Sequence, residues 1–199
     1  MAIVSRGFGG RRQREAETLP PGQYLTEDFP VLTAGPTQYV EPEDWTLTLT
    51  TDTDEQQTWS WEDLLALPVE DVEVDIHCVT RWSKLGTSWR GVPVDAFLEE
   101  VESTADYVMA HSYGGYTTNL PLEDLLDGKA WVAFEYDDGP LPAEHGGPVR
   151  LLVPHLYLWK SAKWLSGFTM LTSDEPGFWE GFGYHNYGDP WREERYDGD

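Results

Sequence analysis

The chain has 199 residues, of which 40% are apolar and ten are Trp. This is enough material for a core in one sizeable domain or two small ones, and it argues against wholesale disorder. The formal net charge is −23, from 36 acidic and 13 basic residues. A surface this acidic repels nucleic acid and anionic membranes, so we expect neither as a partner.

We predict a flexible N-terminal arm over residues 1–20 and a single folded domain over residues 21–199. The pair Arg11-Arg12 is not followed by the apolar stretch that a secretory signal needs. No apolar run approaches the length of a membrane span. A lone cysteine fits a reducing compartment. Together these features predict a cytoplasmic protein without a membrane span.

In the first half of the domain, alternation of apolar and polar residues predicts strands over residues 45–50 and 72–78. Ser60 and Asp63 resemble a capping box, which predicts a short helix that begins there and ends at Pro68. We expect a second short helix over residues 95–101. A strand over residues 107–112 and a turn at Gly114-Gly115 follow it.

In the second half, Pro121 near a helix start and Gly128 as its stop predict a helix over residues 121–128. Further strands are expected over residues 130–136, 149–154 and 166–172. The tail after Pro176 is rich in Gly and aromatic residues, unlike most disordered tails, so we expect it to wrap over the domain. Strands dominate and there is no βαβ rhythm, which predicts an α+β fold.

Cys78 is the one cysteine of the chain and stands at the end of the strand predicted over residues 72–78. It has no partner for an internal disulfide, so it is a packed core thiol, a reactive thiolate or a metal ligand. His77 and Arg81 are close enough in sequence to favour its thiolate. A Cys–His hydrolase would use Cys78 as nucleophile, although nothing local resembles a nucleophile motif. The five histidines lack the paired spacing that zinc ligands show.

A second group of polar residues lies in the segment HGGPVRLLVPHLYLWKSAKW, residues 145–164. His145 and Arg150 flank a Gly-Gly-Pro turn, and Ser161 and Lys163 follow in a second polar turn. Turns that present Arg, Lys, Ser and backbone N–H groups bind phosphate well. Ordinary surface salt bridges are the alternative. The chain has neither a P-loop nor a GxGxxG motif, so the usual nucleotide-binding folds are not predicted.

Two segments, CVxxWS…WxG from residue 78 to 91 and HGGPVR…VPHLYLWKSAKW, resemble the sulfite-oxidase-like molybdopterin oxidoreductases. The match is most similar to the bacterial branch that includes the catalytic subunit of protein-methionine-sulfoxide reductase, and it runs from about residue 20 to residue 196. The resemblance implies the α+β catalytic fold of sulfite oxidase and a molybdenum atom held by one molybdopterin. It makes Cys78 the protein ligand to molybdenum, which agrees with the preference of sulfur-rich metal sites for a soft thiolate.

The resemblance also implies cofactor-binding roles outside Cys78. These are Phe29 through its backbone, Ser112 near the metal, the pair His145 and Arg150, and the phosphate turn of Ser161, Ala162 and Lys163. Arg81 stands where the reductase branch has a small residue, and Thr80 where it has an acidic one, so substrate choice does not transfer. We expect Arg81 to act in catalysis by binding an oxyanion or a sulfoxide oxygen.

These expectations together predict a molybdenum oxidoreductase that carries out two-electron oxygen-atom transfer on a small sulfur or nitrogen oxide. The sequence shows neither the haem domain nor the dimerisation domain of true sulfite oxidases, which predicts a monomer and a separate electron-transfer partner. An inactive binding module with the same fold and a cysteine-nucleophile hydrolase are the alternatives. The acidic residues are spread along the chain, which favours adaptation to a salt-rich cytoplasm over a docking face for a basic partner.

Overall fold

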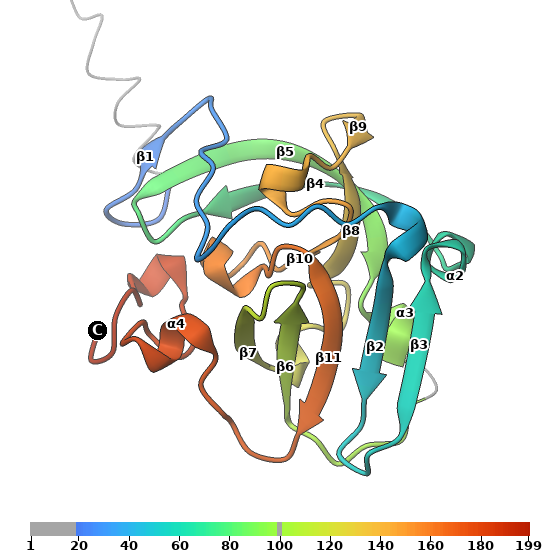
Figure 1. Cartoon of the computed structure of the whole chain (residues 1–199). Helices are drawn as coiled ribbons and strands as arrows, with labels where there is room; N and C mark the ends of the chain where they lie inside the picture. Colours follow the sequence, from blue (N-terminus) through green and yellow to red (C-terminus); the bar gives the residue numbers. More distant parts are fainter. Residues whose placement is uncertain (1–18, 99–100) are drawn as a thin grey trace, which may run out of the picture.

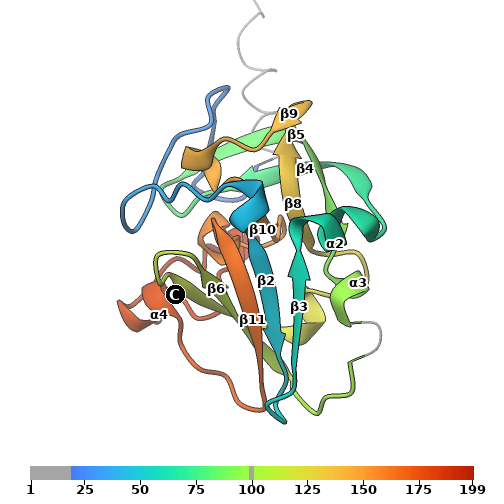
Figure 2. The ribbon, with the colours of Figure 1, turned by 45° about the vertical axis from the view of Figure 1, so that its right-hand side comes forward.

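The computed structural model describes residues 19–98 and 101–199. These residues form two mixed β-sheets with a few short helices at their edges (Figures 1 and 2), which confirms the predicted α+β class. Most of the predicted arm over residues 1–20 lies outside the described residues, but Leu19 and Pro20 are described and buried. In the described part of the chain, no helix has the length and apolar character needed to cross a membrane.

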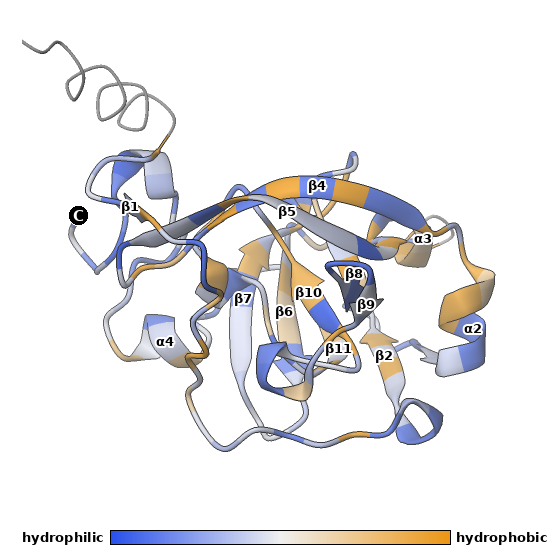
Figure 3. Cartoon of the chain, turned by 90° about the horizontal axis from the view of Figure 1, so that it is seen from above, coloured by the Kyte–Doolittle hydropathy of each residue, from blue (hydrophilic) through white to orange (hydrophobic). Residues whose placement is uncertain are grey.

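The larger sheet has six strands among the described residues, in the order β1-β5-β8-β10, with β4 beside β5 and β9 beside β8. Their bounds are β1 Tyr24–Leu25, β4 Glu70–His77, β5 Trp82–Pro93, β8 Trp131–Tyr136, β9 Gly139–Pro140 and β10 Arg150–Leu152. The short β1 runs parallel to β5, and the other pairs are antiparallel. Apolar and polar residues alternate along β4, as Figure 3 shows.

The second sheet has five strands among the described residues, in the order β3-β2-β11-β6-β7. Their bounds are β2 Thr46–Thr50, β3 Gln56–Ser60, β6 Tyr107–Ser112, β7 Thr117–Pro121 and β11 Leu165–Leu171. Alternation along β2 buries Leu47 and Leu49, while Thr48 faces outward and shares a hydrogen bond with Thr58 of β3. The strand β11 is parallel to β2 and antiparallel to β6, so this sheet is mixed.

The helices are short. Their bounds are α2 Trp61–Ala66, α3 Asp95–Leu98 and α4 Phe178–Gly181, with 3₁₀ turns η1 Pro42–Asp44, η2 Leu122–Asp124, η3 Ala143–His145, η4 Leu158–Lys160 and η5 Pro190–Arg192. The predicted capping box is confirmed, because Asp63 N donates to Ser60 Oγ and Ser60 N donates to Asp63 Oδ2. The helix predicted over residues 95–101 is shorter, and residues 99 and 100 lie outside the described part.

The helix predicted over residues 121–128 is wrong. Pro121 still pairs with Tyr107 in the sheet, and Leu122 N donates to Asp106 O, so strand pairing extends to the point where the helix was expected to begin. Only the single turn η2 follows. The backbone then takes positive φ at Asp127 and at Gly128, a conformation that no helix continues. Pairing with a strand distant in sequence overrides the local Pro and Gly signals here.

Two apolar clusters fill the interior, and β8 contributes to both. Val132 and Phe134 belong to the main cluster, which combines residues of the two sheets, whereas Trp131 and Ala133 belong to a smaller one. The alternation of side chains along a strand explains this division. Cys78 is part of the smaller cluster, so it lies at the edge of a packed region.

The tail after Pro176 wraps over the domain, as predicted. Glu180 in α4 accepts a hydrogen bond from Thr118 of β7 at 2.9 Å. Arg195 donates to the carbonyl oxygens of Val79 and Pro21 at 2.8 and 3.3 Å. Through Arg195, the C-terminal tail therefore contacts both the N-terminal segment at Pro21 and the turn that carries Cys78.

Candidate functional site

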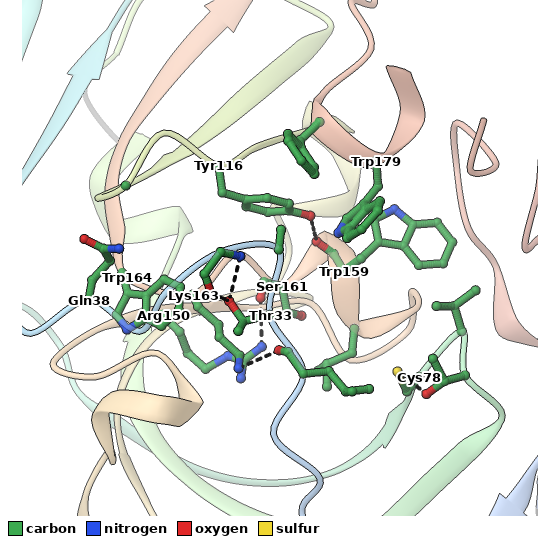
Figure 4. Close-up of a pocket in the computed structure, with 18 of the residues that line it drawn as sticks. Thr33, Gln38, Cys78, Tyr116, Arg150, Trp159, Ser161, Lys163, Trp164 and Trp179 are labelled. Atoms are coloured by element: carbon green, nitrogen blue, oxygen red, sulfur yellow. Dashed lines mark hydrogen bonds between the residues drawn. The ribbon is translucent and has the colours of Figure 1, made fainter. Parts of the chain in front are cut away.

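A cavity of about 340 Å³ lies between segments that are far apart in the sequence. Its size is within the range of small-molecule sites. The lining residues come from five segments, at positions 29, 30, 32–36 and 38, then 78–80 and 82, then 113–116, then 150, 158, 159, 161, 163 and 164, and finally 178, 179 and 184. Of the predicted site residues, Phe29, Cys78, Arg150, Ser161 and Lys163 line it (Figure 4 shows the last four). The fold thus brings together the two sequence segments that carry the resemblance.

Cys78 follows the last residue of β4 and occupies a tight turn. Its N–H donates to Trp82 O, and Arg81 N donates to Cys78 O, both at 2.9 Å. Arg81 adopts a left-handed φ of 77° to close this turn. Gln23 Nε2 also donates to Cys78 O, at 3.1 Å, so the turn is held from the N-terminal segment as well as by Arg195 of the tail. These anchors fix the backbone of the proposed ligand before anything binds.

The thiol of Cys78 is buried and is protonated in the metal-free chain. Burial raises its pKa above the ordinary value of 9.0, although the hydrogen bond from Thr80 and the charges of Arg195 and Lys163 act in the opposite direction. Thr80 Oγ1 lies 3.2 Å from Sγ and donates to it. A metal ion would displace this proton and hold the thiolate.

Arg150 is completely buried and lines another part of the cavity. Its guanidinium donates to the carbonyl oxygens of His145, Ser161 and Leu151 at 2.9, 2.8 and 3.3 Å. A guanidinium has five N–H groups, so these contacts leave donors for a ligand. Burial lowers the pKa of Arg150 to about 10, which still leaves it charged at neutral pH.

Lys163 lies on the same side of the cavity as Arg150 (Figure 4). Its Nζ donates to Leu32 O at 2.8 Å and to Glu144 O at 2.6 Å, which leaves one of three N–H groups. Burial, as the main cause, and repulsion from Arg150, as the second, lower the pKa of Lys163 to about 8. No Asp, Glu or His among the described residues lines the cavity. Two cations without a lining carboxylate fit an anionic group such as phosphate.

His145 does not line the cavity but supports a residue that does. Its ring stacks on that of Phe29, with centroids 3.9 Å apart and planes at 10°. Burial and the charges of Lys163 and Arg150 lower the pKa of His145 to about 4, so the ring is neutral at pH 7. The next residue, Gly146, has a φ of 108°, and a Cβ there would lie 2.9 Å from Lys163 Cα. The Gly-Gly-Pro turn is thus needed for the close approach of Lys163.

The other predicted residues take supporting positions or lie elsewhere. Ser161 Oγ accepts from Val153 N at 2.9 Å, and Ala162 O accepts from Leu151 N at 2.9 Å, so both fix the backbone beside Lys163. Ser112 is buried with no hydrogen-bond partner for its Oγ, and it precedes a turn that lines the cavity. Arg81 is exposed and does not line the cavity, so the structure gives no basis for its predicted contact with an oxyanion.

Several lining residues were not predicted from the sequence. Among them are residues 30, 32–36 and 38, the turn at residues 113–116, and the aromatic side chains of Trp159, Phe178, Trp179 and Tyr184. Gly114 and Gly115 have φ of 88° and 85°, so the Gly-Gly pair was a signal for this turn. The aromatic tail was a second signal, because aromatic residues in a tail must find a surface to cover.

The described residues contain no group of three or more His, Cys, Asp or Glu side chains that could hold a metal ion. A metal bound to Cys78 would therefore need its other ligands from a non-protein group. A soft thiolate suits a sulfur-rich transition metal, and the cations across the cavity suit a phosphate. The residues present fit a molybdopterin cofactor.

Comparison with known proteins agrees with this fit. The model of the oxidoreductase molybdopterin binding domain matches residues 34–179. The uncharacterized oxidoreductase YuiH of Bacillus subtilis is 43% identical over 193 residues, which cover 95% of this chain and 98% of that protein. The putative protein-methionine-sulfoxide reductase subunit YedZ1 of Azospira oryzae is 31% identical, over 67% of this chain and 52% of that protein.

A solved structure shows the same fold. The sulfane dehydrogenase SoxCD of Paracoccus pantotrophus matches with a TM-score of 0.62 and 19% identity, over 69% of this chain and 40% of that chain. The chain thus spans nearly all of YuiH but only about half of YedZ1 and less of the SoxCD chain. The predicted resemblance is confirmed.

Proposed function

The chain belongs to the family of oxidoreductase molybdopterin-binding domains, and on that premise we propose that it is a molybdenum- and molybdopterin-dependent enzyme of oxygen-atom transfer. The substrate is a small sulfur or nitrogen oxide. The observation that carries this proposal is the arrangement of the cavity, in which Cys78 lies apart from the cations Arg150 and Lys163 (Figure 4). A soft sulfur atom and two cations line one cavity, which supports the roles of a thiolate ligand and a phosphate-binding pair.

Each lining residue has a definite task in this proposal. Cys78 would hold molybdenum through its thiolate, and the remaining N–H groups of Arg150 and Lys163 would bind the cofactor phosphate. Phe29, held by His145, would pack against the pterin. When bound, the cofactor supplies a metal that changes its oxidation state by two electrons. Ser112, Ser161 and Ala162 stay predicted contacts.

The net reaction in the reductive direction is balanced by two protons and two electrons. The S–O or N–O bond of the oxide breaks, and the oxygen atom leaves as water. The electrons come from a separate electron-donor protein, which is part of the proposal. The similarity to YedZ1, a putative protein-methionine-sulfoxide reductase subunit, supports this direction.

The geometry disfavours the two alternatives. A nucleophilic thiolate needs a lowered pKa and a nearby base, whereas burial raises the pKa of Cys78 and no described His lines the cavity. An inactive module that binds only the pterin would not need a thiol at this position. Both alternatives are therefore weaker than an enzyme that uses Cys78 as a ligand.

We also propose that residues 21–199 act as a single catalytic domain, as a monomer, in a salt-rich cytoplasm. Exposed acidic residues occur on separate elements, among them Glu62 of α2, Glu73 of β4 and Asp197 of the tail. Such a distribution supports a general adaptation to salt more than one docking face.

Metal analysis of the purified chain tests the proposed function. Protein from a host that makes molybdopterin should contain near-stoichiometric molybdenum, and protein from a host that cannot make it should contain none. With reduced methyl viologen as electron donor, the loaded protein should reduce sulfoxides or N-oxides. If the first preparation contained no molybdenum, the proposal would be wrong.

A further inference from the structure

One wall of the cavity is made of aromatic side chains from separate segments. Trp159 belongs to η4, Trp179 to α4, and Tyr184 to the loop that follows α4. Their rings contact one another, with centroids 4.9 Å apart for Trp179 and Tyr184 and 5.2 Å apart for Trp159 and Tyr184. Phe178 and Tyr116 continue the wall, and their ring centroids are 5.9 Å apart. This surface is therefore continuous.

Two polar groups of this wall, those of Tyr116 and Trp159, are used within the protein. Tyr116 donates its hydroxyl hydrogen to Trp159 O at 2.6 Å, and Trp159 Nε1 donates to Glu180 Oε1 at 2.9 Å. Glu180 is in turn paired with Lys160 in a buried ion pair. The wall consequently offers mainly aromatic carbon faces to a ligand.

The charges of the cavity lie on another side. Among the described Lys and Arg residues, only Arg150 and Lys163 line it. Figure 4 places both of them away from Trp159 and Trp179. Arg195, the other cation that acts on the Cys78 thiol, does not line the cavity and donates to the carbonyl oxygens of Val79 and Pro21.

A small anion at the aromatic wall would lose its hydration without gaining a charged partner, which is unfavourable. The net charge of −23 adds a further repulsion. A neutral molecule with a flat apolar group would instead stack on the aromatic rings. These properties would favour a neutral, flat substrate over a small anion.

We propose that the enzyme prefers neutral oxides that carry an aromatic group, such as aryl sulfoxides and heteroaromatic N-oxides, over sulfite-like anions, and that Trp179 is a specificity-determining residue. This inference rests on the proposed function. For an aryl sulfoxide, the S–O bond breaks, two protons and two electrons are taken up, and a sulfide and water form. The electrons come from the donor protein, for which two equivalents of reduced methyl viologen substitute in the assay.

Steady-state kinetics of the molybdenum-loaded protein test the preference. With reduced methyl viologen, kcat/KM for methyl phenyl sulfoxide should exceed that for dimethyl sulfoxide by at least about tenfold. Sulfite oxidation with ferricyanide should be slower than either reduction. Trp179→Leu should lower kcat/KM for the phenyl substrate by about tenfold and change that for dimethyl sulfoxide by less than about threefold.

A matched control is available in Trp191, which is exposed and does not line the cavity. Trp191→Leu should leave the preference unchanged. Titration calorimetry with methyl phenyl sulfone, which is not reduced, gives a readout that does not depend on turnover, and Trp179→Leu should weaken this binding. If Trp179→Leu fails to fold, Trp179→Phe keeps an aromatic ring, and its smaller effect should have the same direction.

Equal efficiency on the two sulfoxides, or faster sulfite oxidation than sulfoxide reduction, would overturn the inference while leaving the proposed function intact. An equal effect of Trp179→Leu on both sulfoxides would also overturn it. If the chain held molybdenum but processed none of these substrates, the proposed function itself would fail, and this inference with it.

Discussion

Nζ of Lys160 lies 2.6 Å from Oε1 of Glu180, and each of the two side chains is 1% exposed. The pair joins η4 to α4 and thus holds the aromatic wall together. Removing one partner of a buried pair leaves an uncompensated charge, which costs about 3–5 kcal/mol. Lys160→Met should therefore lower the free energy of unfolding by about this amount, measured by urea unfolding of metal-free protein.

The control for this prediction is the ion pair of Arg90 and Asp71. Its Nη1 and Oδ1 atoms are 3.1 Å apart, and the two side chains are 46% and 78% exposed. Arg90→Met should cost less than about 1 kcal/mol, because solvent screens exposed pairs. The double variant Lys160→Met with Glu180→Gln should recover part of the loss, since no unpaired charge is left. A cost for Lys160→Met no larger than for Arg90→Met would contradict the prediction.

Cys78→Ser should keep the fold and lose activity. Ser is nearly isosteric, so the free energy of unfolding should change by less than about 1 kcal/mol, but its oxygen is a poor ligand for a soft metal. Loss of groups that support metal ligands typically costs about 10–100-fold, so loss of the ligand itself should lower kcat by at least about 100-fold. Turnover and molybdenum content are the measurements.

The matched control for Cys78→Ser is Met170→Leu, which replaces a buried sulfur-containing side chain that does not line the cavity. This variant should keep both molybdenum and turnover. Normal turnover by Cys78→Ser would show that Cys78 is not the ligand.

Local signals explain which elements could be predicted from the sequence. Ser60 and Asp63 are three residues apart and satisfy each other's backbone, so the start of α2 needs no distant partner. The strand at residues 107–112 was predicted with its observed bounds, because its apolar residues form a continuous run. The helix prediction for residues 121–128 failed because Pro121 pairs with a strand that the local sequence does not reveal.

The same distinction applies to the site. Cys78 and the segment of residues 145–164 could be proposed from the sequence because each carries its chemistry within a few neighbouring residues, and both contribute to the cavity lining. Trp179 and Tyr184 were not found, because they reach the cavity only when the tail packs against β7 and η4 through Glu180. The catalytic role predicted for Arg81 stays a prediction that the cavity lining does not support. Arg81 is close to Cys78 in sequence, but the turn with its left-handed φ leaves it exposed and outside the cavity lining.

The structure changes the choice of variant for testing the phosphate site. Arg150→Ala would remove one of the two cations that the proposal assigns to the cofactor phosphate. Arg150 is fully buried and bonds to three backbone carbonyl oxygens, so this variant would leave buried acceptors unsatisfied at about 1–3 kcal/mol each. Lys163 is the cleaner choice, because its side chain is only partly buried.

Retention of the cofactor should weaken above pH 8. The pKa of Lys163 is lowered from 10.5 to about 8 in the metal-free chain, so its charge is lost above that pH. Phosphate binding favours the charged form, so binding takes up a proton there and weakens by up to about tenfold per pH unit. For folding alone the sign is opposite: the unfolded state binds more protons between pH 8 and 10.5, so stability rises with pH in that window.

Molybdenum content after dialysis at pH 7 and pH 9 measures this dependence. Lys163→Met should retain less molybdenum at pH 7 and show a smaller change with pH. Lys129→Met, at a site whose Nζ donates to Glu123 O and which does not line the cavity, should behave as wild type. Equal retention by wild type at both pH values would remove Lys163 from the proposed phosphate site.

The stability of the fold should rise with salt into the molar range. The like charges behind the net charge of −23 repel over a Debye length of about 30 Å at 0.01 M salt, which falls to about 3 Å at 1 M. The melting temperature should therefore be higher in molar potassium chloride than at low ionic strength. A variant with Glu62→Gln, Glu73→Gln and Asp197→Asn removes exposed charges from α2, β4 and the tail. Its melting temperature should therefore rise less with salt than that of wild type. A flat or falling trend for wild type would contradict a general salt adaptation and favour an acidic docking face for a basic partner.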